Sequence, residues 1–180
     1  MKATGIVRRI DELGRVVIPK EIRKTLRIRE GDPLEIYTDK EDVLFRKYSP
    51  IASMEEEAAS IEKSLREVTD LIVILFDTDG VIAASGKDTK DLLGEEASDE
   101  LSRMMQERTT RIVSGAADEA TFPLFKREIF PVKAEVAVPV VAGGDLLGCV
   151  VLASKEPLSF GEKELAVAKC AASILANRFS

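Results

Sequence analysis

The chain has 180 residues, no His, no Trp and two Cys, and its formal net charge is −6. The absence of His excludes a Ser-His-Asp triad, a histidine general base and a His-containing zinc site. Cys149 and Cys170 lie too far apart for a C-x-x-C motif and are too few for a disulfide framework, so we expect a reducing, cytoplasmic location. The longest apolar run, residues 71–76, is far shorter than the roughly 20 residues of a membrane helix, and we expect no membrane contact.

Charge is distributed unevenly along the chain. Residues 1–50 carry 12 basic and 9 acidic side chains, a balance of +3, whereas residues 51–180 have a balance of −9. A net acidic protein argues against a nucleic-acid partner, but this asymmetry indicates two modules with different partners. Chance variation of charge between short segments is the alternative explanation.

The first 50 residues have the pattern of a small β-rich domain. Residues 4–10 and 15–18 are predicted strands around a turn at 11–14, and residues 34–38 and 43–47 form a predicted hairpin. Pro19 suits the first turn of a helix that runs to about residue 26. Fifty residues are too few to bury a hydrophobic core that would stabilise the domain alone. We therefore expect this domain to oligomerise.

Two segments show the apolar spacing of narrow helical seams. The first lies within residues 51–69 and the second near the carboxyl end; their seam residues are Ile51, Met54, Ala58, Ile61, Leu65 and Val68, and Leu165, Ala168, Ala172, Leu175 and Phe179. Such helices could join two chains in a four-helix bundle. Alternatively, each seam packs on the sheet of its own domain, and the pattern leaves both interpretations open.

The segment between these helices has a mixed pattern. Hairpins are predicted for residues 71–77 with 81–85, and for 134–142 with 146–154 around Gly143-Gly144-Asp145. Helical spacing of apolar residues predicts a helix from Lys90 to Arg108. We therefore expect an α+β protein with an antiparallel sheet flanked by helices. The predicted domains are residues 1–50, a linker or coiled-coil helix at 51–69, and residues 70–180.

No catalytic, metal or cofactor site emerges from the motifs. Residues 80–88 resemble a phosphate loop, but its glycines are one residue too far apart and Asp88 replaces the required Ser or Thr. Residues 77–80 lack the later ligands of a calcium loop and suit an ordinary hairpin turn. We expect a protein that is not an enzyme and that needs no metal or cofactor.

The basic side chains near the amino terminus are the better candidates for a binding site. On the helix after Pro19, the apolar Ile22 and Leu26 separate from a basic face, and the turn at 11–14 brings further arginines to one end of a hairpin. The guanidinium of Arg can pair with two acceptors on guanine or phosphate. The candidate DNA-binding residues are Arg8, Arg9, Arg15, Arg23 and Lys24. A solvated charged face is the alternative interpretation of this cluster.

Residues 4–26, TGIVRRIDELGRVVIPKEIRKTL, resemble the AbrB family of bacterial transition-state regulators. The likeness continues through residues 31–37 and ends near residues 44–50. Residues 138–151, VPVVAGGDLLGCVV, are more loosely similar to a GAF domain. The resemblance implies a swapped-hairpin dimer whose DNA contacts come from Arg8, Arg15 and Arg23, with Lys24 where many members have Arg.

The whole layout resembles that of AbrB-family sporulation regulators in which such a domain precedes a carboxy-terminal GAF domain. This implies a nucleoid-associated regulator that binds double-stranded DNA by its shape and deformability, and that activates some forespore genes and represses others. The GAF domain would act as a sensor and oligomeriser. Its ligand stays open, because the cyclic-nucleotide signature of some GAF domains is absent.

Two other functions compete with this prediction. MazE-type antitoxins share the swapped-hairpin fold and bind DNA, but they typically end in a disordered tail, whereas residues 51–180 are apolar and periodic. The second competitor is a small-molecule sensor whose first module only dimerises it. A homodimer follows from the small first domain, and the two seams favour a tetramer; the sequence leaves the choice open.

Overall fold

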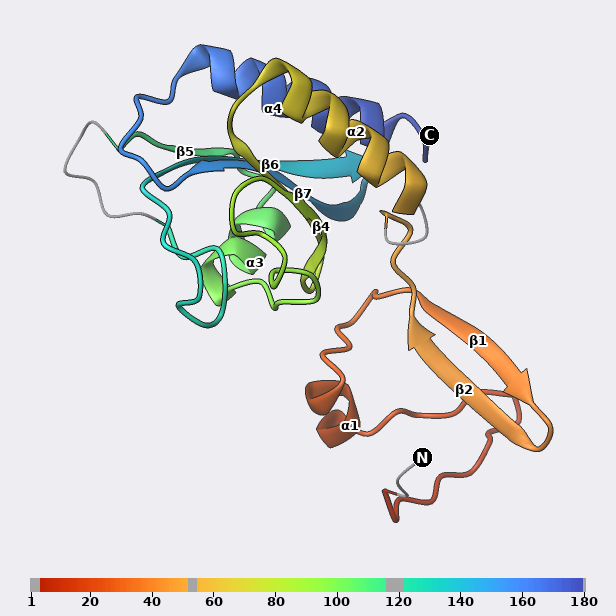
Figure 1. Ribbon diagram of the computed structural model, residues 1–180. Coiled ribbons are helices and arrows are strands. Elements are labelled where there is room, and N and C mark those ends of the chain that lie inside the picture. The colour runs from red at the N-terminus through yellow and green to blue at the C-terminus, as the bar shows by residue number, and fades with distance from the viewer. Residues whose placement is uncertain (1–3, 52–54, 116–121, 180) are drawn as a thin grey trace. The chain divides into compact units, whose positions relative to one another are not determined.

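The computed structural model describes residues 4–51, 55–115 and 122–179, and the chain divides into two compact units, Met1–Tyr48 and Ser49–Ser180 (Figure 1). Met54, one of the predicted seam residues, lies outside the described residues. Helices and strands follow one another in mixed order, with antiparallel pairing in both units, so the predicted α+β class is confirmed.

The first unit contains one short helix and one hairpin. Helix α1 (Lys20–Thr25) follows Pro19 at its N-cap, and strands β1 (Leu34–Asp39) and β2 (Asp42–Lys47) pair antiparallel with Asp39 opposite Asp42. The turn between them places Lys40 in the left-handed region, at a φ of 53°. This hairpin agrees with the prediction from the sequence.

The strands predicted at residues 4–10 and 15–18 are not formed within the single chain. A strand requires a neighbouring strand for its backbone hydrogen bonds, and among residues 4–48 only β1 and β2 pair in this way. The two predicted segments are joined by backbone hydrogen bonds only at their shared turn, between Asp11 N–H and the carbonyl of Arg15.

The first unit buries none of the side chains of residues 4–48. Its large apolar side chains are exposed instead, and Val7, Ile10, Val17 and Ile36 each expose 62% or more of their surface. Folded proteins are stabilised mainly by burying such side chains. The unit therefore lacks a core of its own.

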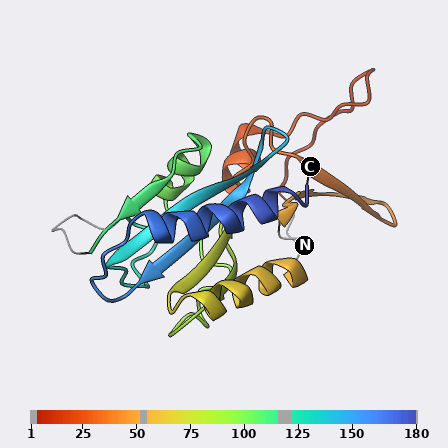
Figure 2. The same cartoon turned by 90° about the horizontal axis from the view of Figure 1, so that it is seen from above.

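The second unit is built on a five-stranded antiparallel sheet in the order β4-β3-β7-β6-β5. Its strands are β3 (Ile72–Asp77), β4 (Val81–Ser85), β5 (Arg111–Val113), β6 (Ala134–Ala142) and β7 (Asp145–Ser154). Helices α2 (Glu55–Val68) and α4 (Glu162–Ala176) cover one face, and α3 (Asp99–Gln106) lies on the other (Figures 1 and 2). Both predicted hairpins of this unit, β3–β4 and β6–β7, are present.

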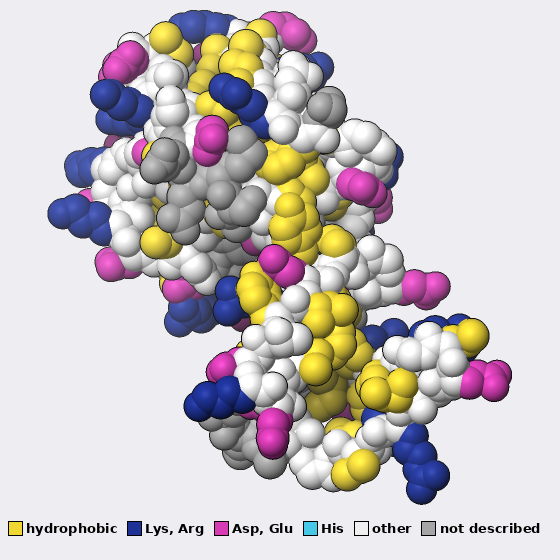
Figure 3. Space-filling model, turned by 90° about the vertical axis from the view of Figure 1, so that its right-hand side faces the viewer, with side chains coloured by type: hydrophobic (Ala, Val, Ile, Leu, Met, Phe, Trp, Pro, Cys, Tyr) yellow, Lys and Arg dark blue, Asp and Glu magenta, His cyan; other side chains and the backbone are white. Residues whose placement is uncertain are grey.

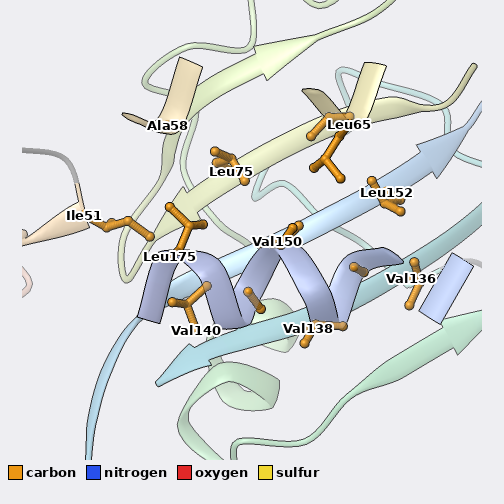
Figure 4. Packing of buried hydrophobic residues seen from close by; sticks show 14 of the residues in the cluster. Ile51, Ala58, Leu65, Leu75, Val136, Val138, Val140, Val150, Leu152 and Leu175 are labelled. Atoms are coloured by element: carbon orange, nitrogen blue, oxygen red, sulfur yellow. The ribbon is translucent and has the colours of Figure 1, made fainter. Parts of the chain in front are cut away.

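Helix α2 contributes side chains to the core of the second unit. Ala58 and Leu65 of α2 are buried in the same cluster as Leu75 and Val150 of the sheet and Leu175 of α4 (Figure 4). The expected linker at residues 51–69 therefore corresponds, in its described part, to a helix that packs on its own sheet. This supports the alternative in which the first seam packs on the sheet of its own domain.

Helix α3 begins nine residues later than the predicted start at Lys90. The Ser98 hydroxyl accepts a hydrogen bond from the Leu101 N–H at 2.8 Å and donates one to the carbonyl of Pro123, which fixes the N-cap. The preceding residues form turns and short bridges, such as Ala97 with Phe125. Helical spacing of apolar residues extended the prediction into a segment whose backbone bonds to Val81 of β4 and to loops instead.

Candidate nucleic-acid interface

All five predicted DNA-binding side chains are exposed on the first unit. Arg8 and Arg9 lie in the extended segment before the turn, and Arg15 follows the turn. Arg23 and Lys24 lie in the last turn of α1, next to each other in the chain. The structure therefore presents five positive charges from two segments, with no described side chain covering them.

Arg15 is the one predicted site residue with a side-chain partner in the described part of the chain. Its Nε lies 2.8 Å from Oδ2 of Asp11. Among residues 4–48 and the described second unit, the guanidinium groups of Arg8, Arg9 and Arg23 have no ion pair. Their hydrogen-bond donors are available to an anionic ligand such as phosphate.

A tight turn at residues 11–15 fixes the position of Arg15. Gly14 adopts a φ of +75°, which a residue without Cβ accepts readily, and its N–H donates to the carbonyl of Asp11 at 3.0 Å. Oδ1 of Asp11 accepts from the N–H groups of Leu13 at 3.0 Å and Arg15 at 2.8 Å. These hydrogen bonds, with those from Arg15 foremost, lower the pKa of Asp11, so its carboxylate is ionised at neutral pH. The turn agrees with the one predicted at residues 11–14, whereas the role of Asp11 in it was not predicted.

Apolar side chains lie on the surface of the same unit (Figure 3). They come from the extended segments and from the hairpin, and include Val7, Val17, Ile36, Val43 and Phe45, each at least 44% exposed. Arg46 lies 4.9 Å from the ring centre of Tyr37, a cation–π contact across the hairpin. The exposed cations of this surface can bind an anionic partner, and its exposed apolar side chains can pack against another apolar surface.

The second unit carries an apolar groove of about 470 Å³ between α2 and α4. Ile61 and Val68 line it from α2, and Val167 and Ile174 from α4. Val68 is 68% exposed and Ile174 46% exposed. The seam residues of α2 are thus divided, since Ala58 packs on the sheet while Ile61 and Val68 line the groove.

The prediction from the sequence also missed a buried carboxyl group, which lies on the face of the sheet that α3 covers. Glu135 of β6 is 1% exposed; its Oε1 accepts from the Phe122 N–H at 3.0 Å, and its Oε2 has no partner among the described residues. Burial raises its pKa to about 7, although the Phe122 hydrogen bond and the charge of Arg111 oppose this. The signal in the sequence is one acid within the apolar strand 134–142.

Residues 4–51, 55–115 and 122–179 contain no cluster of three or more Cys, Asp or Glu side chains that could hold a metal ion. None of the helices described is long and apolar enough to cross a membrane. Cys149 is buried, which raises the pKa of its thiol, and Cys170 is exposed on α4.

Family comparison covers both units of the chain. The family model described as "Stage V sporulation protein T C-terminal, transcription factor" matches residues 53–180, and the model described as "Antidote-toxin recognition MazE, bacterial antitoxin" matches residues 7–52. The MazE match is thus confined to the amino-terminal part, where MazE-type antitoxins were expected to share the fold.

One relative matches almost the whole chain, and another matches only 50 of its residues. Stage V sporulation protein T of Bacillus subtilis is 44% identical over 179 residues, which cover 99% of this chain and 98% of the relative. Transition state regulatory protein AbrB of the same organism is 64% identical over 50 residues, or 28% of this chain and 52% of AbrB. The resemblance to the AbrB family is therefore confirmed.

Among solved structures, a putative GAF sensor protein from Burkholderia vietnamiensis covers 70% of this chain and 84% of its own, with a TM-score of 0.52 and 19% identity. At this identity the likeness concerns the fold alone. It agrees with the GAF-like fold expected for the second unit.

Proposed function

Because the chain belongs to the stage V sporulation protein T family of sporulation transcription factors and has an AbrB-type amino-terminal domain, we propose that residues 4–48 bind double-stranded DNA directly. The observation that carries this proposal is the 64% identity to AbrB over the 50 residues that hold the exposed cations. By its family resemblance, the protein activates some forespore genes and represses others, and works in the cytoplasm at the nucleoid. The full-length relationship favours this function over that of an antitoxin.

The proposed contacts are made by arginine fork groups and by Lys24. Arg8, Arg15 and Arg23 can each pair two N–H groups with a guanine edge or with phosphate oxygens. Lys24 has a single ammonium group, so its role is a phosphate contact. Arg9 adds a further positive charge beside Arg8. Contacts to phosphate bind many sequences, which suits recognition of DNA by shape and deformability.

We also propose that two chains combine their first units into one swapped-hairpin core. In support, residues 4–48 bury no side chain, expose many large apolar ones, and leave the extended segments 4–10 and 15–18 without a pairing strand. When the extended segments of two chains pair, their backbones gain hydrogen-bond partners, and the apolar side chains of both chains become buried against each other. A dimer would also present each arginine twice.

A second contact between chains would join such dimers into a tetramer. The groove between α2 and α4 exposes Val68 and Ile174, and helix faces of this kind are typical of four-helix interfaces. The GAF-like unit would then be the oligomeriser, and it could also act as a sensor if it binds a small molecule. Binding, rather than catalysis, is the proposed activity of the whole chain.

The DNA interface is tested by replacing its arginines in the full-length protein. Arg15→Ala and Arg23→Ala are each expected to weaken binding to a promoter fragment by about tenfold or more, because each removes a charge-assisted contact. Arg103→Ala is the matched control, since Arg103 is an exposed arginine of the second unit. Affinity would be measured by fluorescence anisotropy.

The salt dependence of binding provides a second measurement. Each phosphate contact is expected to contribute about 0.9 logarithmic units to the fall in affinity per tenfold increase in salt. The slope should therefore decrease in the arginine variants and stay unchanged in Arg103→Ala. Parent-like affinity of both arginine variants would show that the site is elsewhere.

A further inference from the structure

The turn before Arg15 places a carboxylate directly against one edge of its guanidinium. Oδ2 of Asp11 accepts from Arg15 Nε at 2.8 Å, while Oδ1 accepts from the backbone N–H groups of Leu13 and Arg15. One side chain thus closes the turn with one oxygen and holds the arginine with the other. The two functions are separable, because they use different oxygens.

This ion pair is poorly placed to stabilise the fold. The side chains of Arg15 and Asp11 are 70% and 39% exposed, and exposed pairs contribute little to stability because water screens them. A carboxylate beside a phosphate-binding arginine also repels DNA by its charge. Its position therefore calls for an explanation other than stability or attraction.

The geometry points to Asp11 as a positioning residue for Arg15, an inference that rests on the proposed DNA interface. A guanidinium has five N–H donors in a rigid plane, and the contact to Asp11 uses Nε. The two terminal Nη groups then form an edge that can pair with guanine O6 and N7 or with two phosphate oxygens. Asp11 fixes the direction of that edge before DNA arrives.

Fixing the arginine in advance favours binding because free arginine side chains lose rotamer freedom when they bind. The carboxylate has two opposing effects, since it repels the phosphates but holds the arginine in a suitable direction. We infer that positioning outweighs repulsion for Asp11. For an acidic side chain that holds no arginine, repulsion acts alone.

Glu12 provides that comparison. It is the next residue in the same turn, it is exposed, and the structure gives it no hydrogen bond or ion pair with a described residue. Glu12→Gln and Asp11→Asn each remove one negative charge. Asp11→Asn also keeps the Oδ1 acceptor of the turn and loses only the charged partner of Arg15 Nε.

The two variants are expected to differ in affinity, although each loses one negative charge. In the full-length protein, Glu12→Gln should bind promoter DNA as tightly as the parent or somewhat more tightly, because repulsion decreases. Asp11→Asn should bind about 3- to 10-fold more weakly, because Arg15 loses its fixed direction. Anisotropy titrations at one salt concentration give both values, and unchanged molar mass and melting temperature show that the turn and the assembly are intact.

A double-mutant cycle then distinguishes positioning from a structural effect on the turn. In the Arg15→Ala background, Asp11→Asn should no longer weaken binding, since the side chain it positions is absent. An equal loss in both backgrounds would mean that Asp11 acts through the turn, and the inference would be wrong. Asp11→Asn binding as tightly as Glu12→Gln would overturn it as well.

The failure of this inference is distinguishable from failure of the proposed interface. If Arg15→Ala weakens binding but Asp11→Asn does not, only the positioning role is refuted. If Arg15→Ala itself binds like the parent, the interface assigned to Arg15 is wrong and the role of Asp11 is refuted with it.

Discussion

Glu135 places an ionisable carboxyl group on the α3 face of the sheet, whose other buried side chains are mostly apolar. Val136 and Val138 of the same strand point to the other face, toward α2 and α4, so strand alternation directs Glu135 to the α3 side. Only one of its oxygens has a partner among the described residues. Burying an ionised carboxylate with so few partners is costly, which is why its pKa is raised to about 7.

This raised pKa predicts how stability depends on pH. The folded protein holds the Glu135 proton more tightly than the unfolded chain, whose value is near 4.5, so stability falls as pH rises from about 4.5 to about 7. Glu135→Gln removes this loss. Relative to the parent, we expect the variant to gain about 2 kcal/mol of stability between pH 5.5 and pH 8, measured by urea unfolding.

The control for this prediction is Glu128→Gln, which replaces an exposed acid of the same unit. Its difference from the parent should be the same at both pH values. The Cys149 thiol near Glu135 does not titrate in this range, because burial raises its pKa. A pH-independent difference for Glu135→Gln would contradict the assignment.

At the scale of single elements, β7 depends on a glycine at its close approach to β3. In the antiparallel register Gly148 is opposite Asp77. A Cβ on Gly148 would lie 2.0 Å from the carbonyl oxygen of Phe76, a backbone atom that a central strand cannot easily move. The hairpin that contains this glycine was predicted from its turn, whereas the close approach appears only when β3 and β7 pair.

Gly148→Ala is therefore expected to destabilise the second unit by about 3 kcal/mol, because the added methyl group forces β3 and β7 apart. Gly161→Ala is the matched control, since nothing lies within 4 Å of its Cβ position and its φ of −158° is ordinary extended backbone. Thermal unfolding of both full-length variants measures the difference. Equal melting temperatures would refute the packing argument.

The elements also show where sequence patterns are reliable. Turn residues predicted the three hairpins, because Gly and Asp at short intervals between β-branched runs have few other conformations. The start of α3 was predicted too early, since helical spacing between Lys90 and Ser98 does not reveal that this backbone bonds to β4 and to loops. The predicted strands at 4–10 and 15–18 need partners that the single chain does not supply.

At the scale of the whole molecule, the two units differ in how they bury apolar surface. The second unit has two clusters of buried side chains, one on each face of its sheet. The first buries none of its described side chains and carries the five candidate DNA-binding cations. We propose that association of two chains buries the apolar side chains of the first unit. The α2–α4 groove is the proposed second contact between chains.

The groove contact is tested by Val68→Glu combined with Ile174→Glu. Both side chains are exposed and line the groove, so the added charges should abolish an apolar contact there without disturbing the core. If the parent is a tetramer, light scattering should give the variant half the parent's molar mass, since the first units still dimerise. Leu93→Glu replaces an equally exposed side chain outside the groove and should leave the mass unchanged. An unchanged mass for the double variant would place the contact elsewhere.

The sequence by itself determined the α+β class and the separation of a basic segment from an acidic one, because these depend on residue types and their spacing, and the resemblance of residues 4–26 identified the family. It also identified the five cations, although their contacts with DNA remain a prediction. Only the tertiary structure decided that α2 packs on its own sheet, that Glu135 is buried and that Asp11 holds Arg15. Each of these depends on which groups meet in space. The net charge of −6 was therefore a poor guide, since it averages over two units with different surfaces.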